Sequence, residues 1–101
     1  MINMDEESIF YEILHLCKKN SLSDDEKKHL NYVFDQNIID INCDDCNFIL
    51  SSSFFGNSDM VQILINHNAD IHIDNNKPHR LAIQNNNIEC IRIFNNAPYN
   101  I

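Results

Sequence analysis

Two cysteines separated by two residues, Cys43 and Cys46, form the pattern in this sequence that points most directly to chemistry. Such a pair supplies half of the ligands of a structural zinc site. The other two cysteines, Cys17 and Cys90, are distant in the chain and form no second close pair. A redox role needs a lowered thiol pKa within a thioredoxin-like pattern, which the sequence lacks. We therefore predict no metal, no cofactor and four reduced cysteines.

Histidines and serines are the next candidates for chemistry. The histidines are His15, His29, His67, His72 and His79. They form no His-Glu-x-x-His pattern and no cluster with carboxylates. His79 beside Arg80 could bind an anion, and the alternative is a solvated helix face. Residues 51–53 are serines with no base at a useful spacing, and they fit positions where helices approach closely. The sequence therefore predicts no catalytic residue, and we expect a protein that is not an enzyme.

Charge and hydropathy narrow the classes of partner. The 101 residues carry 7 Lys and Arg against 15 Asp and Glu, for a formal charge of −8. This balance argues against nucleic acid, because binding phosphates takes a basic face, and it favours a basic partner or simply solubility. No signal peptide pattern opens the chain, and no apolar run is long enough to span a membrane. We expect a cytoplasmic protein without membrane contact.

Two segments of the chain repeat each other at a spacing of 30 residues, beginning at Asp40 and at Asp70. The matching pairs are Asp44 and Asp74, Asn57 and Asn87, Ile63 and Ile93, and Asn66 and Asn96, and Ile41, Ile71 and Ile101 share one phase. In this register Cys43 and Cys46 match Ile73 and Asn76, which makes them ordinary connector positions. A fixed period of this size predicts a solenoid of stacked units, which usually binds other molecules.

Two helices are expected before the repeats. Acidic residues 5–7 and the pair Lys18–Lys19 complement the dipole of the first helix. Ser23 and Glu26 form a capping box that opens the second helix, which extends to about Gln36. The N-terminal part therefore predicts a helical hairpin.

Each repeat is predicted to hold two helices. In the first repeat, residues 47–55 form an inner helix that ends at Gly56, and Ser58 caps an outer helix. In the second, Asn76 caps an inner helix with Pro78 in its first turn. Residues 88–95 form its outer helix. Asn68 and Asn86 are expected to replace glycine in left-handed turns.

The string Gly56-Asn-Ser-Asp-Met-Val-Gln-Ile-Leu-Ile-Asn-His-Asn-Ala-Asp-Ile resembles the turn and outer helix of the ankyrin repeat family. The usual period of that family is about 33 residues. The shorter period here resembles the ankyrin arrays of giant DNA viruses of amoebae, as do Ala69-Asp-Ile, Asp74-Asn and Arg80-Leu-Ala. Several family marks are missing: no Thr-Pro-Leu-His is present, and Asn86, Asn68 and Pro98 replace glycines of the pattern.

This resemblance implies an all-α, short ankyrin-type helix-turn-helix solenoid. Residues 1–39 would be a helical N-terminal cap, followed by repeats at 40–69 and 70–101. The family implies a non-enzymatic protein–protein interaction module that binds through a concave face of connector tips and inner helices. For a viral chain the partner would be a host regulatory protein in the host cytoplasm.

The residues predicted to bind the partner are Asp44, Asp45, Phe54, Phe55, Asp74, Asn75 and His79. The two phenylalanines align with Gln84 and Asn85 of the next repeat. At least one ring is therefore an exposed interface anchor, or both pack against the N-terminal hairpin.

The C-terminal edge leaves three alternatives open. Polar residues at 80, 84, 85–87 and 95–96 would cover it and give a monomer. An edge exposing Leu81, Ile91 and Phe94 would instead dock a partner or a second copy, giving a self-assembling module that forms a weak homodimer. The third alternative is a stop codon inside a decaying gene.

Overall fold

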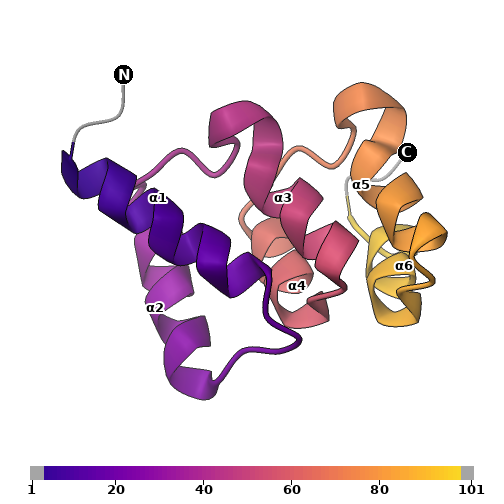
Figure 1. Cartoon of the computed structure of the whole chain (residues 1–101), viewed down its shortest axis with the longest axis horizontal. Coiled ribbons are helices and arrows are strands. Elements are labelled where there is room, and N and C mark those ends of the chain that lie inside the picture. The colour runs from indigo at the N-terminus through magenta and orange to yellow at the C-terminus, as the bar shows by residue number, and fades with distance from the viewer. Residues whose placement is uncertain (1–3, 99–101) are drawn as a thin grey trace.

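The structure is a computed structural model, and it describes residues 4–98, which contain helices and no strand (Figure 1). The helices are α1 (Met4–Cys17), α2 (Asp24–Asp35), α3 (Cys43–Phe55), α4 (Ser58–Asn66), α5 (Ile73–Gln84) and α6 (Ile88–Asn95). The expectation of an all-α fold is confirmed. None of these helices is long and apolar enough to cross a lipid bilayer.

The helices form three hairpins that stack side by side in two rows (Figure 1). In the first row α3 packs between α1 and α5, and in the second row α4 packs between α2 and α6. The N-terminal hairpin therefore stacks on the first repeat in the same way as the first repeat stacks on the second. The first row corresponds to the inner helices expected from the sequence.

The N-terminal hairpin closes as its sequence predicts. The Ser23 hydroxyl accepts from the backbone N–H of Glu26 at 3.1 Å, and the Glu26 carboxylate accepts from the backbone N–H of Ser23 at 2.8 Å. This capping box satisfies two N–H groups that the start of a helix leaves without partners. Lys19 also pairs with Glu26 at 2.7 Å, an exposed ion pair that adds little stability.

A left-handed turn opens each first-row helix of the two repeats. Asp44, Asp45 and Cys46 have φ angles of 53°, 54° and 64°, and Asp74, Asn75 and Asn76 repeat this conformation at 50°, 57° and 61°. Right-handed helix begins only after them, which agrees with the expected start at residue 47. Asp and Asn tolerate left-handed backbone better than most residues, and this explains their concentration here.

Hydrogen bonds ahead of these turns are also repeated. Asp40 Oδ1 accepts from the backbone N–H of Asn42, and Asp70 Oδ1 accepts from that of His72, both at 2.9 Å. Asn42 Oδ1 in turn accepts from the backbone N–H of Asp70, also at 2.9 Å. This last bond joins one connector to the next, so the connectors support each other along the stack.

Two expected helix caps differ in the structure. Asn57, rather than Ser58, caps α4, because its Oδ1 accepts from the backbone N–H of Met60 at 3.0 Å. Asn76 caps nothing with its side chain, because it is the last residue of a left-handed turn and its Oδ1 faces His72 Nδ1 at 2.6 Å. Pro78 does lie in the first right-handed turn of α5, where its missing N–H is tolerated.

Residues in left-handed conformation also end the helices where the sequence predicts them. Gly56 has a φ of 78°, and Asn68 and Asn86 have φ angles of 64° and 56°. A Cβ atom at position 56 would lie 2.7 Å from the side chain of Asn87. Gly56 therefore allows both the turn and the close approach of the next hairpin.

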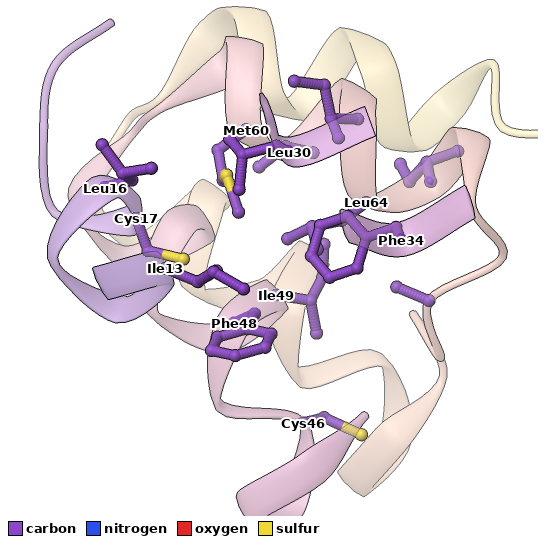
Figure 2. Packing of buried hydrophobic residues seen from close by; sticks show 14 of the residues in the cluster. Ile13, Leu16, Cys17, Leu30, Phe34, Cys46, Phe48, Ile49, Met60 and Leu64 are labelled. Atoms are coloured by element: carbon purple, nitrogen blue, oxygen red, sulfur yellow. The ribbon is translucent and has the colours of Figure 1, made fainter. Parts of the chain in front are cut away.

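The core runs continuously through the three hairpins. Figure 2 shows Ile13, Phe34, Phe48, Ile49 and Leu64 pointing into this shared interior from helices of both rows. Phe48 is fully buried, and its ring lies between Phe10 at 5.4 Å and Phe34 at 6.3 Å, measured between ring centroids. Ile71 is buried and Ile41 is half-buried, whereas Ile101 lies outside the described residues.

Candidate protein-binding surface

Two neighbouring phenylalanines at the end of α3 remain uncovered. Phe54 and Phe55 are 49% and 45% exposed, and their rings meet edge to face with centroids 5.1 Å apart. They line a hollow of about 320 Å³ between α3 and α5. The other lining residues are Leu50, Ser51, Lys77 and Leu81.

This exposure excludes the alternative in which both phenylalanines pack against the N-terminal hairpin, since such rings would be buried. The lining of the hollow is largely apolar and comes from successive first-row helices. Leu50 and Leu81 are half-buried, and Lys77 is the only charged lining residue of this hollow. An apolar side chain of another protein could fill such a space.

The left-handed turns carry four of the predicted binding residues. Asp44, Asp45, Asp74 and Asn75 are all exposed at the starts of α3 and α5, which project from the same side of the stack (Figure 1). Asp44 accepts a hydrogen bond from Asn47 Nδ2 at 2.8 Å. Within residues 4–98 none of the three carboxylates forms an ion pair, so their negative charge is not neutralised.

The negative charge of these carboxylates affects the pKa of the Cys46 thiol. Its pKa is raised above the ordinary 9.0, first by burial and then by the carboxylates of Asp70, Asp40, Asp45 and Asp74. The pKa of Cys43 is raised as well, by burial and then by Asp40 and Asp44. Raised pKa values keep both thiols protonated and poorly nucleophilic.

His79 occupies a different position from the other predicted residues. Its half-buried ring lies against Phe94 of α6, with centroids 5.6 Å apart. The neighbouring Arg80 turns back on the left-handed turn, where its guanidinium donates to the carbonyl oxygens of Asp74 and Asn75. The structure therefore does not place His79 in the hollow beside Phe54 and Phe55.

A second hollow, of about 400 Å³, lies between α1 and the first left-handed turn. Glu7, Phe10, Tyr11 and Asp44 line it. Tyr11 is 59% exposed and meets Phe10 edge to face at 5.1 Å. Sequence reasoning missed this site, because Glu7 and Tyr11 precede the repeats and have no equivalents in the 30-residue register.

The cysteines and serines considered for metal or nucleophilic chemistry lie in the described part of the chain. No group of three or more His, Cys, Asp or Glu side chains within residues 4–98 is arranged to hold a metal ion. All four cysteines are free thiols. The buried hydroxyls of Ser52 and Ser53 donate to the carbonyl oxygens of Phe48 and Ile49, at 2.8 and 2.6 Å.

The edge formed by α5 and α6 is partly apolar. Ile83 and Ile88 are 54% and 58% exposed, and Leu81 and Ile91 are half-buried. Phe94, which one of the three alternatives exposes on this edge, is only 1% exposed, because it packs inside the last hairpin against His79. Exposed polar residues at 84–86 and 95–96 share this part of the surface.

Stacked helical hairpins with an uncovered face define a helical repeat protein of the kind that the sequence predicts. Within it, residues 49–76 match the family model of the ankyrin repeat. The matched segment runs from α3 through α4 to the second left-handed turn, and it supports the resemblance to the ankyrin repeat family. No curated protein and no solved structure matches the chain. The particular resemblance to viral arrays therefore gains no support from a relative.

Proposed function

We propose that this protein is a non-enzymatic module that binds another protein through the first-row face, defined as the exposed side of α1, α3 and α5 with their left-handed turns. The observation that carries the proposal is the pair of half-exposed rings, Phe54 and Phe55, over an apolar hollow. Ankyrin repeats are generally protein–protein interaction modules, and residues 49–76 match that repeat.

Aromatic side chains suit this role for a physical reason. A phenylalanine has few rotatable bonds, so it buries a large apolar area at a small cost in conformational entropy. Anchors of this kind contribute about 2 kcal/mol or more each when they are central to an interface. The adjacent turns add exposed carboxylates and backbone groups, which can set the orientation of the partner.

Residues 1–39 act as the N-terminal cap of the repeats at 40–69 and 70–101. Binding takes place in the cytoplasm, where free thiols such as those of this chain persist. The 30-residue period resembles that of viral ankyrin arrays. A regulatory protein of a host cell is therefore the first class of partner to test.

The test compares proteins captured from a cell lysate by the tagged chain and by two variants of it. Phe54→Ser combined with Phe55→Ser removes both anchors. Tyr32→Ser is the matched control, because Tyr32 is 59% exposed on the second row. Circular dichroism establishes that each variant is folded.

A specific partner should be captured by the chain and by the Tyr32→Ser variant, and its recovery should fall at least tenfold with the double variant. Equal recovery with the double variant would show that the first-row face is not the binding surface.

A second candidate function is self-assembly through the α5–α6 edge. The observation in its favour is the exposure of Ile83, which is the register equivalent of the fully buried Ser53. Within residues 4–98 no element covers that side of α5. A second copy could cover it, and the mass of the protein in solution distinguishes this candidate from the first.

A further inference from the structure

The first-row face combines two hollows with an uneven distribution of charge. The connectors at residues 40–46 and 70–76 contain five aspartates and no lysine or arginine. Four of the seven basic residues of the chain lie elsewhere, at positions 18, 19, 27 and 28, where α1 ends and α2 begins. The start of the first-row helices is therefore the acidic end of an acidic protein.

Lys77 and Arg80 follow the second left-handed turn, and neither forms an ion pair with a carboxylate within residues 4–98. The Arg80 guanidinium is held by backbone carbonyl oxygens of residues 74 and 75. Lys77 lines the apolar hollow and forms no ion pair within residues 4–98. A partner that brings positive charge to this end would meet carboxylates that form no ion pair within residues 4–98, and it would gain electrostatic attraction.

The hollow between α1 and α3 has the chemistry that a cationic side chain needs. The exposed ring of Tyr11 offers a face for a cation, and Glu7 and Asp44 bring two carboxylates to the same hollow. Neither carboxylate has a cationic partner within the described residues. Arginine or lysine could place its alkyl stem against the ring and its charge between the acids.

We propose that the partner is recognised through a basic segment, with a lysine or arginine in the Glu7–Tyr11–Asp44 hollow and a neighbouring apolar side chain in the Phe54–Phe55 hollow. This inference rests on the proposed protein-binding function and specifies the chemistry of the partner. Phe54 lies about 12 Å along the α3 axis from the left-handed turn, at 1.5 Å per residue. An extended chain covers this distance and the step between helices in roughly four to six residues.

The experiment is a selection from a random peptide display library with the whole chain as bait. The acidic-turn variant, Asp44→Asn with Asp45→Asn and Asp74→Asn, removes three charges and keeps residues that tolerate left-handed backbone. The control variant, Asp24→Asn with Asp25→Asn and Asp35→Asn, removes the same charge from α2, in the second row. The Phe54→Ser and Phe55→Ser double variant is the fourth bait.

The chain and the control variant should select peptides with a net positive charge and with basic and apolar residues at the spacing given above. The acidic-turn variant should bind a selected peptide at least tenfold more weakly. Tyr11→Leu should weaken it roughly two- to fivefold, because the ring contributes a cation–π contact. Raising the salt concentration should also weaken binding, because exposed charges are screened.

Selection of peptides without a basic bias, still lost in the phenylalanine variant, would overturn this inference and leave the proposed function intact. Equal weakening by the acidic-turn and control variants would overturn it as well. A result in which no peptide is enriched, or in which the phenylalanine variant binds the same peptides equally well, would overturn the proposed function and this inference with it.

Discussion

Asparagine side chains join one hairpin to the next at equivalent positions. The fully buried Asn57 donates from Nδ2 to the carbonyl oxygen of Leu16 at 3.0 Å, across the junction between the first two hairpins. Asn87 donates from Nδ2 to the carbonyl oxygen of Ser53 at 2.8 Å, across the second junction. Each bond satisfies a carbonyl at the end of a first-row helix, where helices leave such groups without partners.

We predict that Asn57→Ala lowers the free energy of unfolding by about 2 to 3 kcal/mol, because it removes both a helix cap and a buried hydrogen bond. Asn87→Ala should lower it by about 1 kcal/mol, since Asn87 is half-buried and makes no capping bond. Urea denaturation of the two variants measures the difference. Equal losses would contradict the different roles assigned to them.

Burial raises the pKa of the Cys17 thiol to about 12, from its ordinary 9.0. Between these two values the unfolded chain loses a proton that the folded chain keeps, so stability should fall as the pH rises. From pH 8 to pH 10.5 this effect amounts to about 2 kcal/mol. We expect Cys17→Ala to remove that part of the pH dependence in urea denaturation, and an unchanged slope would count against a buried neutral thiol.

The sequence predicted correctly those residues whose structural role depends only on neighbouring backbone groups. It predicted the capping box at Ser23 and the left-handed residues at 56, 68 and 86, because these depend on neighbouring backbone groups. It chose Ser58 over Asn57 as a cap, since both residue types are suitable. The position of His79 against Phe94 was missed, because it depends on how α5 rotates over α6.

Among the elements, the left-handed turns are the least predictable from sequence. Single Asp and Asn residues in left-handed conformation are common, and this preference alone gives no reason to expect three in succession. Ahead of the turns, the bonds accepted by Asp40 and Asp70 are local, whereas the bond from the Asp70 N–H to Asn42 joins residues 28 positions apart. A long-range bond of this kind becomes visible only once the hairpins are stacked.

Substitutions at Asn75 test the left-handed turn. Its φ of 57° suits glycine better than alanine, so Asn75→Gly should be about 1 kcal/mol more stable than Asn75→Ala. At the exposed Lys28, inside α2, the order should reverse and alanine should be favoured by about 1 kcal/mol. Thermal unfolding of the four variants gives both comparisons, and alanine being favoured at both sites would contradict the left-handed conformation.

At the scale of the molecule, the sequence predicted two stacked repeats and the helical hairpin before them. It did not predict that α1 would share a surface with α3 and α5, because the packing angle between hairpins leaves no pattern in the sequence. Tyr11 and Glu7 were missed for this reason. The exposure of Phe54 and Phe55 was anticipated because they depart from the polar residues at the matching positions 84 and 85.

The α5–α6 edge leads to a prediction about the whole chain. Exposed polar residues at 84–86 separate the exposed Ile83 and Ile88 in the chain, so we expect a monomer of 11.8 kDa by light scattering across a dilution series. Ile83→Lys with Ile88→Lys should leave this mass unchanged. A dimer that dissociates on dilution and is lost in the double variant would instead favour self-assembly.

Three asparagines form bonds between neighbouring hairpins: Asn42 accepts from the backbone N–H of Asp70, and Asn57 and Asn87 donate to carbonyl oxygens of the preceding hairpin. These bonds have a consequence for how such a chain can change in length. Asn57 recurs 30 positions later as Asn87, whereas the equivalent of Asn42 is His72, so residues 40–69 are the unit that holds both junction asparagines. An in-frame duplication of one such unit would therefore bring its own junction partners with it. Arrays built this way can lengthen or shorten by whole units without inventing new contacts, which makes unit number a variable on which selection can act.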